Sequence, residues 1–172
     1  MKKYLATIGL ALLLSACATA PQLAAPEAIQ PPAPIVGNTG KFMSPYTEDG
    51  TVAKWVEKGR NAAAGANIGG FVGATAGAKL AENIPFVGGI IGQKVGESVG
   101  RTVALNMVGG EQYIKQTSDL SFNTPEDLAV YMYAKNSSHK DYAKVLELTQ
   151  KIYPELQQAY YPAILKASAG KR

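Results

Sequence analysis

Two rows of glycine with four-residue spacing constrain this chain more than any other feature of its sequence. A glycine inside a helix costs about 0.5–1 kcal/mol relative to alanine, so repeated helical glycines need another explanation. A four-residue spacing places them on one stripe of a helix, where the missing side chains let a second backbone approach closely. Ala81 and Ala104 continue the two rows, and a turn is expected at Asn83-Ile84-Pro85 between them. The rows are Gly65, Gly69, Gly73, Gly77 and Gly88, Gly92, Gly96, Gly100.

We therefore predict a glycine-zipper helical hairpin over residues 51–110, with these glycines as its helix-packing positions. A floppy linker is the alternative, but linkers show no such fixed spacing. The second helix carries Lys94, Glu97 and Arg101 on the face opposite its glycines, and Glu97 and Arg101 are spaced to pair. Such charges are costly inside lipid, so an isolated membrane-spanning hairpin is not expected. The hairpin either packs within an oligomer at the membrane, which we favour, or lies peripherally against the C-terminal helices.

The N-terminus has the pattern of a secretory signal that ends in a lipidation site. A positively charged start precedes an apolar run from Tyr4 to Leu14, which has the length of a signal peptide core and is too short for a permanent span. The ending Leu14-Ser15-Ala16-Cys17 looks like a bacterial lipobox. In proteins with a lipobox the cysteine takes a diacylglycerol, and the preceding residues are removed. We predict that residues 1–16 are a signal peptide and that Cys17 carries acyl chains such as palmitate. An ordinary signal peptide or N-terminal anchor is the alternative.

Composition and motifs disfavour several classes of function. Loss of the signal peptide lowers the formal net charge from +4 to about +2, which gives no warrant for nucleic-acid binding. With Cys17 acylated, the chain keeps no thiol for a metal site or a nucleophile. His139, the single histidine, lies beside a predicted helix start and is expected to be a solvated capping residue. We predict no catalytic residue, no metal site, no cofactor other than the covalent lipid and no small-molecule substrate; the protein is not expected to be an enzyme.

Residues 17–50 are predicted to be a disordered tether between the lipid and the folded part. The segment contains six prolines and no apolar periodicity, so it cannot by itself bury enough surface to offset the entropy of ordering. An ordered, extended arm clamped onto the domain is the alternative. The fold class that we expect is mainly α, with the zipper hairpin and a small C-terminal helical bundle following this tether.

Residues 111–172 are predicted to form that helical bundle. Thr124-Pro125-Glu126-Asp127 is a capping pattern that starts a helix expected to end at Lys135. Ser138-x-x-Asp141 is expected to start a second helix, whose apolar positions from Tyr142 to Tyr153 follow a 3.6-residue period. Pro154 opens a third helix that Pro162 should kink or end. Tyrosines are frequent here and are expected in the helical core, with a ligand or peptide groove as the alternative. Earlier in the chain, Trp55 fits the start of an amphipathic helix or an interfacial anchor.

The lipobox followed by the doubled glycine row resembles the small glycine-zipper outer-membrane lipoproteins, the SlyB-like or common-surface-antigen group. The resemblance covers the signal peptide, Cys17 and residues 65–104, roughly a third of the chain. It implies a membrane-associated helical hairpin that self-assembles in the cell envelope. Ala18, rather than Asp, after the cysteine suggests the outer membrane.

We expect a structural or interaction protein that is lipid-anchored in the bacterial outer membrane and faces the periplasm. Its expected partners are membrane lipid and either further copies of itself, as a homo-oligomer, or an outer-membrane protein. The alternative function is an accessory lipoprotein subunit of an envelope secretion or export complex, acting through its C-terminal helices.

Overall fold

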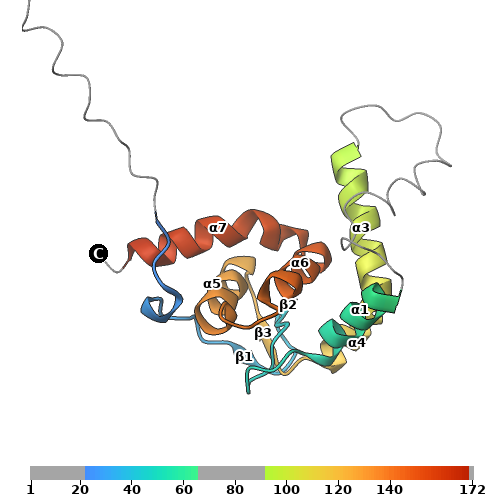
Figure 1. The fold of residues 1–172 in the computed structure, drawn as a ribbon, viewed down its shortest axis with the longest axis horizontal. Coiled ribbons are helices and arrows are strands. Elements are labelled where there is room, and N and C mark those ends of the chain that lie inside the picture. The colour runs from blue at the N-terminus through green and yellow to red at the C-terminus, as the bar shows by residue number, and fades with distance from the viewer. Residues whose placement is uncertain (1–21, 66–91, 171–172) are drawn as a thin grey trace, which may run out of the picture.

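The fold is mainly helical, as the sequence predicts, with a small three-stranded sheet. The computed structural model describes residues 22–65 and 92–170 (Figure 1). The elements in chain order are η1 (Pro26–Ala28), β1 (Ile35–Val36), β2 (Phe42–Met43), α1 (Lys54–Gly65), α3 (Gly92–Val108), α4 (Gly110–Gln116), β3 (Leu120–Phe122), α5 (Pro125–Asn136), α6 (Tyr142–Ile152) and α7 (Pro154–Ala169).

The sheet joins the N-terminal part of the chain to its second half. Its strand order is β1-β3-β2 and both pairings are antiparallel, with Ile35 opposite Ser121 and Phe42 opposite Phe122. All three residues of β3 are buried. Gly40 is required beside β3, because a Cβ there would lie 2.7 Å from the carbonyl oxygen of Phe122. The sheet therefore fixes residues 35–43 against a strand about eighty residues further along the chain.

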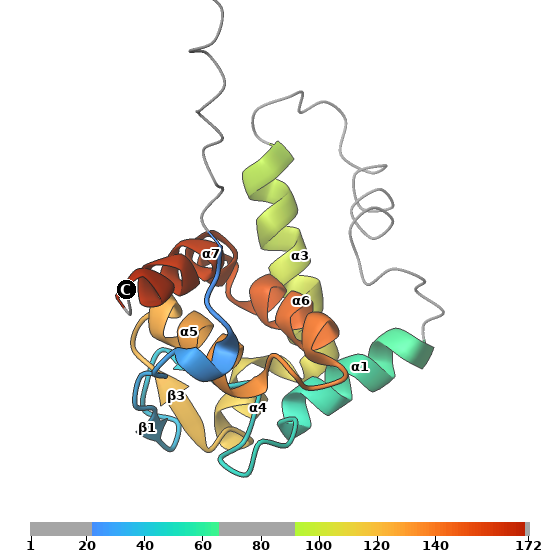
Figure 2. The same cartoon turned by 60° about the vertical axis from the view of Figure 1, so that its left-hand side comes forward.

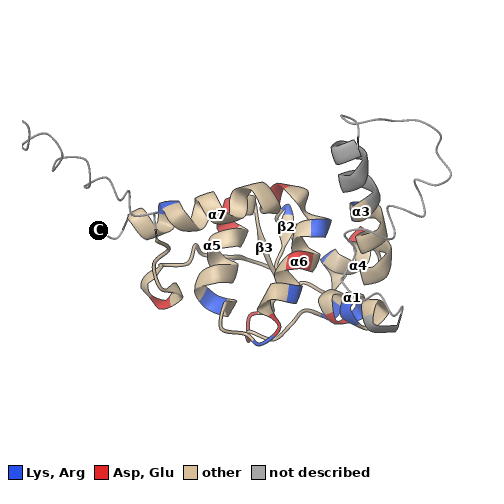
Figure 3. Ribbon diagram, turned by 45° about the horizontal axis from the view of Figure 1, so that its top comes forward, with Lys and Arg blue, Asp and Glu red and all other residues tan. Residues whose placement is uncertain are grey.

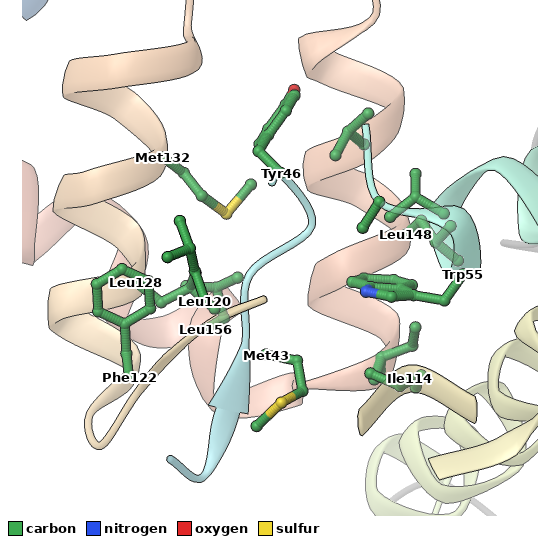
Figure 4. Close-up of a cluster of buried hydrophobic side chains, with 14 of the residues drawn as sticks. Met43, Tyr46, Trp55, Ile114, Leu120, Phe122, Leu128, Met132, Leu148 and Leu156 are labelled. Atoms are coloured by element: carbon green, nitrogen blue, oxygen red, sulfur yellow. The ribbon is translucent and has the colours of Figure 1, made fainter. Parts of the chain in front are cut away.

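Residues 22–50, which we call the N-terminal arm, are ordered, so the prediction of a disordered tether is wrong from residue 22 onward. Ile29, Met43 and Tyr46 are buried, and Figure 4 shows Met43 and Tyr46 between the side chains of α5 and those of Trp55 and Leu148. The arm can bury little apolar surface against itself, which is why its sequence alone predicts disorder. The arm is instead stabilised by a core whose other residues come from far along the chain, as the alternative of a clamped arm requires.

Trp55 lies at the start of α1 and is fully buried in the core. Its indole Nε1 donates a hydrogen bond to Ser118 Oγ at 3.1 Å. The expected helix start is confirmed, whereas the alternative of an interfacial anchor is wrong. The buried side chains of the core come from the arm, α1 and every helix from α3 to α7.

The predicted starts of the first and third C-terminal helices are confirmed, whereas α6 begins at Tyr142, with Asp141 and not Ser138 at its N-cap. Thr124 caps α5 by accepting a hydrogen bond from the Asp127 backbone N–H at 3.1 Å, and Pro125 occupies the first turn. α6 buries residues that recur with the expected helical period, and α7 begins at Pro154. Pro162 does not end α7, which continues to Ala169. Leu156 and Ile164, on either side of this proline, are both fully buried, and their packing offsets the lost backbone hydrogen bond.

α1 and α3 are the described ends of the predicted zipper hairpin. They pack against each other, and α3 also packs against α6, which lies in the C-terminal region. Figure 2 shows α3 rising beyond the body of the protein while its lower part lies beside α6. Within residues 22–65 and 92–170, no helix combines the length and apolar character that crossing a membrane requires.

Candidate functional site

The predicted lipidation residue, Cys17, lies outside the described residues, but the structure defines where the chain that carries it joins the fold. Ala24 N–H donates a hydrogen bond to Ser168 Oγ on α7 at 2.9 Å. Tyr133 Oη on α5 donates to the Ala24 carbonyl oxygen at 3.0 Å. Both backbone groups of Ala24 are thus held by the domain, seven residues after Cys17.

The predicted zipper glycines divide into those within α1 and α3 and those outside the described residues. Gly65 ends α1, and Gly92, Gly96 and Gly100 lie in α3. The others, Gly69, Gly73, Gly77 and Gly88, fall in the part of the chain that the structure does not describe.

Gly100 is the zipper position whose surroundings are described. A Cβ built on Gly100 would meet no atom of the described chain within 4 Å. The same stripe of α3 continues, at four-residue intervals, to Ala104 and Val108, which are 2% and 0% exposed. The zipper stripe thus points in the direction in which α3 packs, and at Gly100 it leaves space that the described part of this chain does not fill.

Gly59 is a close-packing glycine that the four-residue rows did not reveal. A Cβ on Gly59 would lie 2.8 Å from Val108 Cγ1 and 2.9 Å from Leu148 Cδ2, so α1 approaches α3 and α6 closely at this point. The available signal was weaker: an isolated glycine within a helical pattern often marks close packing. In the described part of the hairpin, the tight helix contact therefore lies where α1 meets Val108 at the C-terminal end of α3.

A basic hollow lies where α3, α4 and the arm meet. Its volume is about 320 Å³, and its walls carry three positive charges and the one negative charge of Glu111; the positive charges are those of Lys41, Arg101 and Lys115. Arg101 Nε donates to the Ile152 carbonyl oxygen at 3.0 Å, and its guanidinium pairs with Glu111 at 2.6 Å. Glu97, the expected partner of Arg101, has a side chain outside the described part. The hollow has the charge to accept a small anion, but Lys41 and Lys115 are exposed on its rim, where water weakens such binding.

The tyrosines of the C-terminal helices mainly line the core. Tyr142 and Tyr160 share a hydrogen bond of 2.6 Å between their hydroxyl groups. Burial raises the pKa of Tyr142, and the neighbouring Tyr160 adds to the shift. Burial likewise raises the pKa of Tyr153 to about 12. These neutral, buried phenols support the expected core role. Tyr161, in contrast, is 50% exposed on α7.

Tyr46 and His139 meet beside this tyrosine cluster. Their rings are in edge contact with centroids 5.5 Å apart, and burial together with the nearby Asp141 raises the pKa of the Tyr46 phenol. His139 Nδ1 accepts a hydrogen bond from the Asp141 backbone N–H at 3.2 Å. The histidine thus lies just before α6 as expected, but it is half-buried against Tyr46, and Asp141 is the N-cap, so the expected solvated capping role is wrong. Arg60 pairs with Asp141 at 3.0 Å. Across residues 22–65 and 92–170 no cluster of three metal-ligating side chains is present.

Comparison of the chain with known protein families, with curated proteins and with solved structures finds no match.

Proposed function

We propose that this chain is a lipoprotein of the bacterial outer membrane that assembles through its glycine-zipper hairpin and has a structural or interaction role in the envelope. Lipid on Cys17 anchors the chain on the periplasmic side, and the rows from Gly65 to Gly100 provide the contact between helices. Two acyl chains are enough for stable anchoring.

The observation that carries the assembly proposal is the direction of the stripe on α3. Ala104 and Val108 at its C-terminal end are buried, and Val108 closes against Gly59 of α1. Gly100, one turn before Ala104, leaves open space on the described side of the same stripe. A stripe without side chains that extends a packed helix face beyond the body of the protein offers close backbone contact to another helix.

The assembly proposal is tested by native gel electrophoresis of detergent-extracted protein. Gly73→Leu, Gly96→Leu and Gly100→Leu should each reduce the size of the assembly, because a branched side chain separates the backbones. Gly170→Leu is the matched control, since Gly170 is exposed and belongs to neither row. Gly100→Leu is the sharpest variant, because its Cβ contacts no described atom of the monomer. Unchanged assembly in all three variants would refute the zipper role.

The anchoring proposal is tested separately by metabolic labelling with a palmitate analogue. Wild type should incorporate the label and fractionate with the outer membrane, whereas Cys17→Ser should do neither. Incorporation of label by Cys17→Ser would refute Cys17 as the lipidation residue. Photocrosslinking from a residue next to Gly100 distinguishes the partners: capture of a second copy supports self-assembly, and capture of an export component supports the accessory-subunit alternative. The whole chain must be used, because Met43, Tyr46 and Trp55 complete the core of the C-terminal helices.

A further inference from the structure

We infer that the outward surface of α7 lies against the lipid surface to which the protein is anchored. We call this surface the α7 face; the exposed residues of the helix are Glu155, Gln157, Gln158, Tyr161, Pro162, Lys166 and Ala169. The inference rests on the proposed lipidation of Cys17. Lipidation of Cys17 fixes only that the chain is anchored; the orientation of α7 specifies which side of the domain meets the membrane.

The chain between the lipid and the folded domain is short. Cys17 and Ala24 are seven residues apart, which spans at most about 25 Å when fully extended. A flexible segment of this length reaches about 15 Å on average. α7 alone, with 16 residues, is about 24 Å long. The side of the domain that holds Ala24 therefore stays, on average, within about two thirds of one helix length of the lipid, and at full extension within about one helix length.

The chain leaves the domain beside the C-terminal end of α7. Ala24 is bonded to Ser168, close to the C-terminal end of α7, and to Tyr133 on α5. Figures 1 and 2 show the first described segment of the arm (blue) rising beside this end of α7, with α5 beneath α7. The same views place the loop between β2 and α1 (teal) on the opposite, lower side. The short lipid-bearing segment thus pulls the α7 face, rather than the side that carries this loop, toward the bilayer.

The α7 face carries residue types that suit a lipid surface. Lys166 is exposed near the Ala24 contact, and Tyr161, exposed by half, is a residue type enriched where protein meets the lipid headgroups. Glu155, in the first turn, is the single carboxylate in the sequence of α7, and Figure 3 shows the helix uncharged over most of its length. Glu27 of η1 is also exposed.

The other side of the domain carries exposed carboxylates beside the exposed lysines Lys54 and Lys58. Glu48 and Asp49 are exposed in the loop between β2 and α1, and the Glu48 backbone N–H donates to Asp119 Oδ2 at 3.0 Å. An anionic bilayer repels the two carboxylates of this loop and attracts Lys166 on α7. Lys54 and Lys58, exposed directly after the loop, and Glu155 on α7 oppose this difference, so the orientation rests on the tether length and on the side from which the chain leaves the domain.

This orientation also defines where assembly occurs. The beginning of α3 rises on the same side as α7 in Figures 1 and 2, whereas α1 ends lower in both views, so it is the described stripe on α3 that reaches the lipid-facing side. Contacts along the zipper would then form between copies anchored side by side in one membrane.

The test measures the distance of two labels from the lipid headgroups in the full-length, lipidated protein. The protein is placed in vesicles of phosphatidylethanolamine and phosphatidylglycerol that contain a headgroup-labelled nitroxide lipid. A fluorophore is attached to one engineered cysteine, Gln158→Cys on the α7 face or Glu48→Cys on the opposite loop; both positions are exposed. Because Cys17 is the chain's single native cysteine and would be acylated, the engineered thiol is the one that reacts.

We expect quenching at position 158 to exceed quenching at position 48 by about twofold or more, since the short tether keeps the two sides at different depths. A spacer of about 20 Gly and Ser residues inserted before Ala20 should bring the two values together while the protein stays bound. Equal quenching at both positions in the protein without the spacer, or stronger quenching at position 48, would overturn the orientation. Flotation separates the two failures: protein that does not float with the vesicles refutes the anchor and the orientation together, whereas floating protein with equal quenching refutes the orientation alone.

Discussion

Replacing Gly59 and Gly100 by alanine, one at a time, compares two glycine positions in the hairpin. Gly59 packs tightly against the C-terminal end of α3, whereas Gly100 lies about two turns earlier on α3 with open space beside it. Both glycines lie inside helices, so each substitution gains the same intrinsic helix stability, about 0.5–1 kcal/mol. Their surroundings differ: a Cβ on Gly59 would lie below 3.0 Å from atoms of Val108 and Leu148, whereas a Cβ on Gly100 meets nothing described within 4 Å.

The comparison isolates the cost of the close contact because the helix propensity cancels. Overpacking a core by one methyl group costs about 1–3 kcal/mol. Gly100→Ala should therefore stabilise the fold by about 0.5–1 kcal/mol, and the free energy of unfolding of Gly59→Ala should lie about 1–3 kcal/mol below it. Urea denaturation followed by the fluorescence of Trp55, the chain's single tryptophan and fully buried, measures both values. Equal stability of the two variants would show that α1, α3 and α6 do not meet as closely at Gly59 as described.

Three further results are expected. Ser118→Ala should destabilise the fold by about 1–3 kcal/mol, because the buried Trp55 N–H loses its acceptor; urea denaturation measures the loss, and an unchanged midpoint would contradict that hydrogen bond. Tyr46→Phe should raise stability by about 1 kcal/mol at neutral pH, because the Tyr46 hydroxyl is buried with no hydrogen-bond partner in the described part of the chain. Burial holds the pKa of Tyr46 above its usual value, so the folded protein keeps that proton when the unfolded chain has lost it; wild type loses stability above about pH 10, and the advantage of phenylalanine should widen there. Ser168→Ala should release the start of the arm and speed proteolysis before Ile29, with little change in the global unfolding midpoint; unchanged cleavage would mean that Ser168 does not hold the arm.

Local signals in the sequence were sufficient for the starts of α5 and α7 and for the apolar period of α6. The capping residue Thr124, the first-turn prolines Pro125 and Pro154 and the apolar period of α6 act within a few residues of where they stand, so each predicted its element correctly. The lipobox at Cys17 and the glycine rows are also local patterns. They remain predictions about parts of the chain that lie largely outside the described residues.

The order of the arm could not be predicted, because it depends on residues distant in the chain. Strands of two residues do not hold together alone; β1 and β2 exist because β3 lies between them, and Tyr46 is ordered by a core that includes Leu128 and Leu148. The same reason explains Pro162, which local rules place at a kink or a helix end and which tertiary packing keeps inside α7.

The sequence by itself determined the helical class, most of the helix starts and the candidate anchor and zipper residues, because capping, periodicity and short motifs act over one or two turns. Only the tertiary structure decided that the arm is part of the core, that Gly59 is the tight helix contact and that Ala24 binds α7. Each of those contacts joins residues between about 50 and 150 positions apart, and the free energy that orders them comes from surface buried jointly.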